Sequence, residues 1–77
     1  MIGRQKFDEI RQRAKACAAR EAVYDQVSDF ALKQAKASLD ANQLDISDAW
    51  TTIATFCMNK ISDELKYLQD LRRELDT

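Results

Sequence analysis

The sequence predicts an all-α protein: a long antiparallel helical hairpin, formed by residues 4–39 and 47–75, that dimerises into a four-helix bundle. Two observations favour helices. The 77 residues contain no proline and a single glycine, Gly3, so a multi-stranded sheet would lack turn residues. Apolar residues also recur every three or four positions, which is the spacing of one helix face. We therefore expect a single helical domain over residues 1–77.

The first predicted helix, residues 4–39, is rich in the helix formers Ala, Gln, Arg and Lys. Its apolar residues follow two stripes, which are offset by about 150°. The first stripe contains Phe7, Ile10, Ala14 and Cys17, then reaches polar residues at Glu21, Asp25 and Ser28, and resumes at Leu32, Ala35 and Leu39. The second stripe contains Ala16, Ala19, Val23, Val27 and Phe30.

Two arrangements explain a helix with two stripes. Either the chain breaks within residues 18–29 and forms a three-helix bundle, or one continuous helix contacts two neighbours. Because residues 18–29 contain no helix breaker, we expect the continuous helix. The second stripe then predicts self-association, since a hairpin alone buries one seam on each helix.

The second predicted helix, residues 47–75, has the clearer pattern. Its apolar stripe contains Trp50, Ala54, Cys57, Ile61, Leu68, Leu71 and Leu75. Asp45 or Ser47 is the predicted N-cap, because short oxygen-bearing side chains accept the first free backbone N–H groups. Residues 40–45 form the predicted connection, with Asn42 as the candidate for a left-handed backbone conformation.

Cys17 and Cys57 are 40 positions apart and form no CxxC pair. A turn centred near residue 43 would place Cys17 opposite residue 69 and separate the two thiols by roughly 18 Å. This separation exceeds the limit for a disulfide, which requires Cα atoms within about 7 Å. We expect two reduced thiols in the core.

The chain lacks the residues that most catalytic sites need. It has no His, no Gly-rich phosphate loop and no metal-ligand spacing. Glu21 and Glu64 fall on the predicted core stripes and could share a layer, but carboxylate metal sites in helical bundles also use His. We expect these carboxylates to pair with Arg20 or Lys60 instead, and we expect no enzymatic activity, cofactor or metal.

The charge distribution offers one functional hypothesis. Residues 1–20 carry six cations against two acids, although the whole chain has a net charge of −1. A nucleic-acid-associated regulator could use this basic helix to neutralise phosphates. The candidate residues are Lys6, Arg13 and Arg20 on one side, and Arg4, Arg11 and Lys15 on the other. The sequence pI of about 5.3 and the absence of a recognition motif weigh against this alternative.

Exposed apolar residues support the favoured hypothesis, a small protein–protein interaction module that acts as a homodimer. Phe56 and Tyr67 lie about 110–120° away from the main stripe of their helix. The candidate interface residues are Val23, Val27, Phe30, Phe56 and Tyr67. An adaptor, an inhibitor or a regulatory subunit would work in this way, by contact with another protein.

The sequence also suggests a compartment. The N-terminus has no apolar signal segment, and no apolar stretch reaches the roughly 20 residues that span a bilayer. We expect a cytoplasmic protein. Because Met1 opens the chain and no linker flanks the helices, we also expect a complete small protein.

Overall fold

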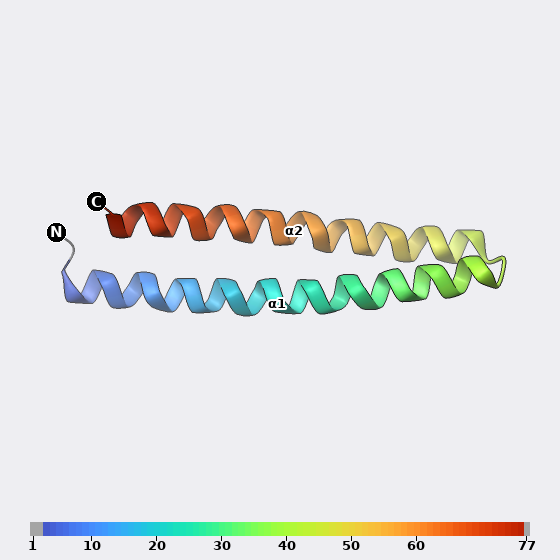
Figure 1. The fold of residues 1–77 in the computed structure, drawn as a ribbon, viewed down its shortest axis with the longest axis horizontal. Helices are drawn as coiled ribbons and strands as arrows, with labels where there is room; N and C mark the ends of the chain where they lie inside the picture. Colours follow the sequence, from blue (N-terminus) through green and yellow to red (C-terminus); the bar gives the residue numbers. More distant parts are fainter. Residues whose placement is uncertain (1–2, 77) are drawn as a thin grey trace.

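The computed structural model describes residues 3–76 and contains two helices. Helix α1 (Arg4–Asp40) and helix α2 (Leu44–Asp76) run antiparallel and lie side by side along their whole length (Figure 1). The pair measures 59 × 15 × 11 Å, so it forms a single flat layer two helices wide. The predicted helical hairpin is confirmed.

Helix α1 is continuous over 37 residues. The alternative with a break within residues 18–29, and with it the single-chain three-helix bundle, is therefore wrong. Neither glycine nor proline interrupts Arg4–Asp40, so each backbone N–H keeps its partner one turn earlier.

The connection between the helices is shorter than predicted. Asn42 adopts the left-handed conformation, with a φ of 60°, as its sequence position indicated. The N–H groups of Asn42 and Gln43 donate to the carbonyls of Leu39 (3.0 Å) and Ser38 (2.8 Å). This closes the turn within residues 41–43, because one left-handed residue reverses the chain direction.

Helix α2 therefore begins at Leu44 rather than at residue 47. The predicted N-cap, Asp45 or Ser47, is wrong, because both residues lie inside the helix. The Ser47 hydroxyl instead donates to the carbonyl of Ala35 (2.9 Å) and joins the two helices near the turn.

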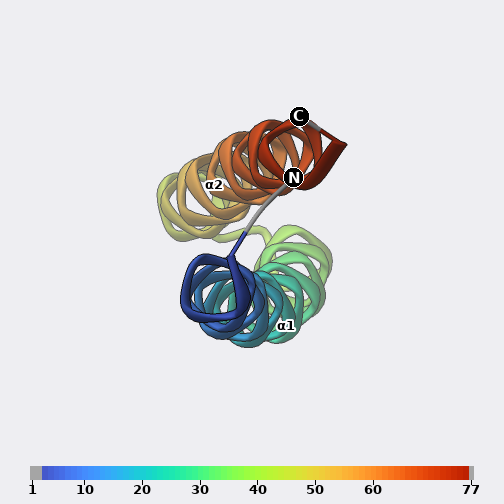
Figure 2. The same ribbon diagram turned by 90° about the vertical axis from the view of Figure 1, so that its left-hand side faces the viewer.

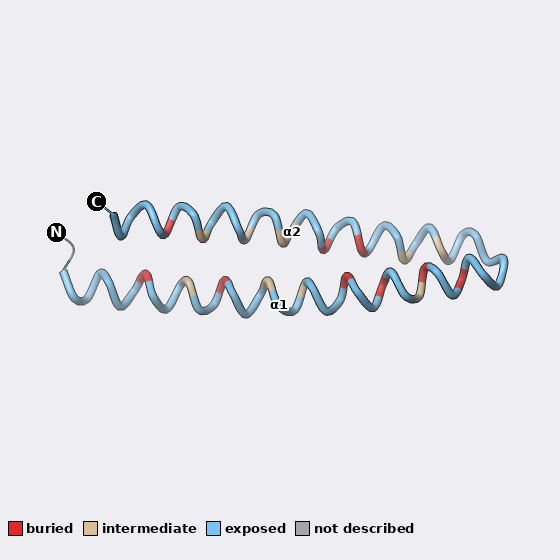
Figure 3. The backbone as a smooth tube through the Cα atoms, viewed as in Figure 1, coloured by how far each residue is buried: buried red, intermediate tan, exposed pale blue. Residues whose placement is uncertain are grey.

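The two helices meet along a seam that follows a seven-residue repeat. The seam residues of α1 are buried or half-buried: Ile10, Ala14, Cys17, Glu21, Tyr24, Ser28, Ala31, Ala35 and Ser38. Those of α2 are Ser47, Trp50, Ala54, Cys57, Ile61, Glu64, Leu68 and Leu71. Figure 3 shows these residues on the facing sides of the two helices. Their alternating spacing of three and four defines a coiled coil, and the helices wind around each other in the left-handed sense that this repeat imposes (Figure 2).

The seam corrects the predicted course of the first stripe. The stripe does not leave the interface at its polar residues but passes straight through Glu21, Tyr24 and Ser28. It continues on Ala31, Ala35 and Ser38, whereas Leu32 and Leu39, which we expected on this stripe, are exposed. Small side chains at the seam let the two helices approach closely, so the larger leucines lie outside it.

The resulting core is thin. The apolar residues that are buried in the described chain are Ile10, Cys17, Ala31, Ala35, Ala54, Cys57 and Leu71. Five of these seven are Ala or Cys, and the two larger residues, Ile10 and Leu71, lie near the open end of the hairpin. Such a seam removes little apolar area from water, and the hydrophobic free energy is proportional to that area.

Candidate functional site

The middle of the seam holds a cluster of three polar residues: an ion pair between Arg20 and Glu64, and the thiol of Cys17. Arg20 Nε donates to Glu64 Oε1 (2.7 Å), and Arg20 Nη2 donates to Glu64 Oε2 (3.0 Å). The Cys17 thiol, which is fully buried, lies 2.8 Å from Glu64 Oε2 and 3.1 Å from the Glu64 carbonyl oxygen. This two-point ion pair confirms that Glu64 pairs with Arg20. It also places Cys17 opposite Glu64 rather than residue 69, because the turn is shorter than we expected.

The cluster shifts the pKa values of its members. The hydrogen bonds from Arg20, and then the one from Cys17, lower the pKa of Glu64. The same ion pair raises the pKa of Arg20. Burial and the Glu64 hydrogen bond raise the pKa of the Cys17 thiol, so this thiol stays protonated. The Cys17 side chain packs inside the seam, where it is fully buried. Both cysteines are free and buried, as the sequence indicated.

The more extensive feature lies outside the seam. Fourteen large apolar residues within residues 3–76 are exposed. At about 100° per residue, those of α1 lie on two opposite sides of its seam. In an antiparallel pair, matching sides of the two helices lie together, so the fourteen residues form two faces of seven residues each.

The first of these, the Phe30 face, contains Val23, Val27, Phe30, Ile46, Ile53, Phe56 and Tyr67. The Phe30 ring contacts the Trp50 ring edge-on, with 5.6 Å between the centroids, which confirms that both helices contribute to this side. Phe30 and Phe56 are 54% and 58% exposed. All five residues predicted for a protein interface, Val23, Val27, Phe30, Phe56 and Tyr67, thus lie on one face.

The Phe30 face carries no charge over its half nearest the turn. Between residues 23 and 37, the positions of α1 on this side are Val23, Val27, Phe30, Gln34 and Ala37. Between residues 46 and 56, those of α2 are Ile46, Ala49, Ile53 and Phe56. Lys60 lies at the border, where its ammonium group is 5.4 Å from the centre of the Phe56 ring.

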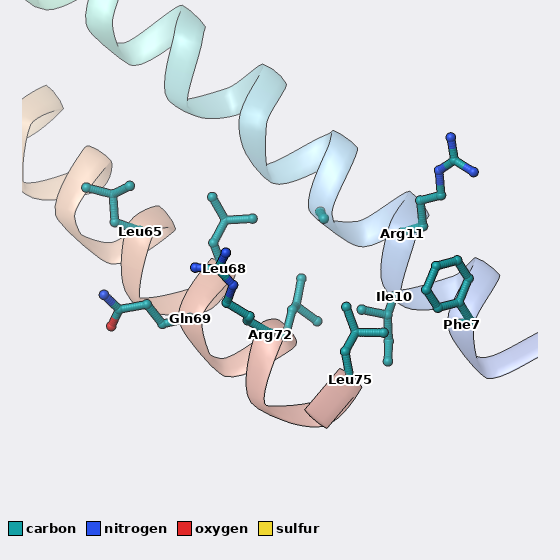
Figure 4. A pocket seen from close by; sticks show the side chains of 10 residues that line it. Phe7, Ile10, Arg11, Leu65, Leu68, Gln69, Arg72 and Leu75 are labelled. Carbon is teal, nitrogen blue, oxygen red and sulfur yellow. The ribbon is translucent and has the colours of Figure 1, made fainter. Parts of the chain in front are cut away.

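The opposite side, the Leu65 face, contains Phe7, Leu32, Leu39, Leu44, Met58, Leu65 and Leu75. Near the open end of the hairpin, this face is hollowed into a groove of about 600 Å³. Figure 4 shows Phe7, Leu65 and Leu75 around this groove, together with Arg11 and Arg72. These two arginines are the charged residues that line it, and neither forms an ion pair within residues 3–76.

Sequence reasoning did not identify the Leu65 face as a surface. Leu32, Leu39 and Phe7 were placed on the buried stripe, and Leu44 and Met58 were not assigned to a face. Leu32, Leu39, Leu44 and Met58 share a position directly beside the seam, which could be recognised only after the polar Glu21 and Ser28 had been placed inside it. Phe7 instead continues the repeat of the seam at the open end, where it is 47% exposed.

The six predicted nucleic-acid candidates do not form one surface. Lys6, Arg13 and Arg20 lie on the side of the Phe30 face, and Arg20 is paired with Glu64. On the other side of the seam lie Arg4, Arg11 and Lys15. The basic helix therefore divides its cations between two opposite sides of the hairpin.

Two other kinds of feature are absent from residues 3–76. No group of three or more Cys, Asp or Glu residues is arranged to hold a metal ion. Neither helix in this range has an apolar stretch long enough to cross a membrane.

Comparison with known proteins identifies no relatives. No protein-family model matches the chain, and no curated protein or solved structure is significantly similar to it.

Proposed function

We propose that this chain is a small, non-enzymatic protein–protein interaction module that acts as a homodimer, in the manner of an adaptor, an inhibitor or a regulatory subunit. The observation that carries the proposal is the set of fourteen exposed large apolar residues on two opposite faces. Large apolar residues exposed in such numbers are typical of proteins that bind other proteins.

The surface area of the hairpin supports this proposal. The chain exposes 5996 Å², whereas a compact monomer of 8.8 kDa would expose about 4,800 Å². Its radius of gyration is 17.5 Å, against about 11–12 Å for a compact chain of 77 residues. The excess area exceeds the roughly 800 Å² that each partner buries in a stable interface.

The Phe30 face has the properties of a docking site for an amphipathic helix of another protein. Two antiparallel helices form a shallow groove between them, and a third helix can lay apolar residues at i, i+3, i+4 and i+7 into it. Since the half of this face nearest the turn is uncharged, its partner needs an apolar stripe without matching charges. The aromatic Phe30 and Phe56 are the expected anchors.

The cytoplasm is the proposed location. Cys17 and Cys57 are both free, and cysteines remain reduced in that compartment.

A capture experiment from native lysate tests the proposed function. The purified chain is immobilised, the lysate is treated with nuclease, and the bound proteins are compared between the wild type, Phe30→Asp and Phe56→Asp. We expect a partner that binds the wild type, resists a rise in salt from 50 to about 200 mM and is lost with either variant. Gln26→Asp, an exposed change on the outer side of α1, is the matched control and should retain the partner.

Two results would contradict this proposal. If the wild type and both Phe variants capture the same amount of the partner, the Phe30 face does not bind it. Loss of all bound material after nuclease, together with loss of binding on charge reversal of Lys6 and Arg13, would favour the nucleic-acid alternative.

A further inference from the structure

The charges on the Leu65 face are arranged unequally along its length. Near the open end, this side of the two helices carries four cations and two acids: Arg4, Arg11, Lys15, Arg72, Asp8 and Asp76. In the half nearest the turn, it carries three acids and one cation: Asp25, Asp29, Asp48 and Lys36. One half of the face is therefore net positive, and the other half is net negative.

The Leu65 face is complementary in charge to the Leu65 face of a second copy whose long axis points in the opposite direction. A twofold axis through the centre of the hairpin superposes the positive half of one copy on the negative half of the other. The centre is at residue 22 of α1 and residue 60 of α2, the midpoints of Arg4–Asp40 and Leu44–Asp76. Twofold pairing buries the same patch on both subunits, and each contact occurs twice.

This axis places oppositely charged residues at matching levels. Lys15 lies at the level of Asp29 of the second copy, and Asp8 lies at the level of Lys36. On α2, Arg72 lies at the level of Asp48 of the second copy. Arg72, which lacks an ion pair within the described chain, thereby gains an acidic partner.

The apolar residues match in the same arrangement. Leu75 lies within one residue of the level of Leu44 of the second copy, and Phe7 lies within two residues of the level of Leu39. The groove of about 600 Å³ at the open end would thus receive leucines from the turn end of the second copy. At about half exposure, seven such side chains present on the order of 500 Å² of apolar area, to which the charged rim adds. This total approaches what one partner of a standard interface buries.

We propose that the Leu65 face binds a second copy of this chain in the antiparallel, full-overlap arrangement, which produces a four-helix bundle. Each helix then lies antiparallel to its neighbours, and the Phe30 face of each copy remains free on the outside. The proposed arrangement rests on the homodimer of the proposed function. It specifies which face forms the dimer interface, the register of the two copies and their relative direction. The Phe30 face carries no comparable charge pattern that would select its own reversed copy.

Sedimentation equilibrium of charge variants tests the face and the register. We expect Arg72→Asp or Asp48→Arg alone to raise the dimer dissociation constant by about tenfold, because symmetry replaces two attractive pairs with two repulsive ones. The double variant, Arg72→Asp with Asp48→Arg, should restore dimerisation to near the wild-type level. Lys66→Asp, on the outer side of α2, is the charge-matched control for Arg72→Asp and should leave the dimer unchanged.

Oxidative cross-linking tests the direction. Ala22 lies beside the proposed axis, so Ala22→Cys should form an intermolecular disulfide in the dimer. Gln69 is on the same face, but its two copies would be about 27 Å apart along the bundle, so Gln69→Cys should not cross-link. The native thiols of Cys17 and Cys57 are buried in the seam, so they should not compete with the introduced thiol for oxidation.

The possible failures are distinguishable. If Arg72→Asp and Asp48→Arg leave the dimer dissociation constant unchanged but Phe30→Asp dissociates the dimer, the second copy binds to the Phe30 face. That result would refute the proposed interface on the Leu65 face but would still support a homodimer. Failure of the double variant to restore dimerisation, or cross-linking at Gln69→Cys and not at Ala22→Cys, would refute the antiparallel register. A monomer at every concentration would refute the homodimer itself.

Discussion

At the scale of single residues, the carboxylate of Glu64 is held in the seam by the hydrogen bonds that it accepts. Its carboxylate lies between a guanidinium that can reach solvent and a fully buried thiol, and it accepts hydrogen bonds from both. Removal of one partner from such a pair leaves the other without its hydrogen bonds, which is costly where water has poor access. Within residues 3–76, every buried side-chain nitrogen and oxygen has a hydrogen-bond partner.

The lowered pKa of Glu64 predicts acid sensitivity. A carboxylate whose pKa is lower in the folded state stabilises the fold fully above its unfolded pKa of about 4.5. That stabilisation is lost as the pH falls through the lower folded-state pKa. We therefore expect Glu64→Gln to have a lower Tm than the wild type at pH 7, with a difference that shrinks below pH 4.5.

Thermal melts followed by circular dichroism between pH 7 and about pH 3 measure this difference. Asp70→Asn is the control, because Asp70 forms an exposed pair with Arg73 at 3.7 Å and should change Tm little at any pH. A Tm difference between wild type and Glu64→Gln that stays constant over the whole range would show that the ion pair contributes nothing.

At the scale of elements, three residues of connection fix the register of two long helices. Asn42 supplies the left-handed residue, and the carbonyls of Ser38 and Leu39 accept the turn hydrogen bonds. The hydroxyl of Ser47 then ties the start of α2 to Ala35. Every contact between the two helices, including Cys17 with Glu64 in the seam and Phe30 with Trp50 beside it, depends on this register.

Substitutions in the turn test its contribution. Asn42→Ala should reduce the free energy of unfolding by about 1 kcal/mol, because alanine lacks the short polar side chain that lets asparagine hydrogen-bond locally in the left-handed conformation. Asn42→Gly should retain or increase stability, since glycine adopts that conformation without a penalty. Urea unfolding measures both, with Gln43→Ala as the control at a neighbour that lacks a positive φ. Equal losses for Asn42→Ala and Gln43→Ala would contradict the argument.

At the scale of the whole molecule, the hairpin is a single layer with two apolar sides. A two-layer domain buries one side of each layer against another element. Here each helix buries a narrow seam, and seven large apolar residues remain exposed on either side. The proposed dimer provides the second layer on the Leu65 face, and the proposed partner helix covers the Phe30 face.

A stability that depends on association must depend on concentration. For a dimer that unfolds to separate chains, a hundredfold rise in concentration should raise Tm by about 8 °C. Circular dichroism melts from about 1 to 100 μM measure this shift. A constant Tm would show that the hairpin is stable alone and would contradict the need for a second copy.

The sequence was sufficient for the fold class and for several particular residues. The absence of proline and of internal glycine indicated two uninterrupted helices, and Asn42 indicated the turn, because both features act through local backbone geometry. The five residues predicted for an interface are all exposed on one face, because helical periodicity places them away from the seam. These inferences depend on the chain's own geometry and need no knowledge of its neighbours.

What the sequence did not decide was which polar residues lie inside the seam. Glu21, Tyr24 and Ser28 resemble exposed positions until the opposite helix is packed against them, where they are half-buried or buried. Once they are placed inside, Leu32 and Leu39 move to the surface and a second apolar face becomes evident. Local sequence features account for two helices and a turn. The register and the two apolar faces depend on how the helices pack, because burial of a polar group depends on the partner that satisfies it.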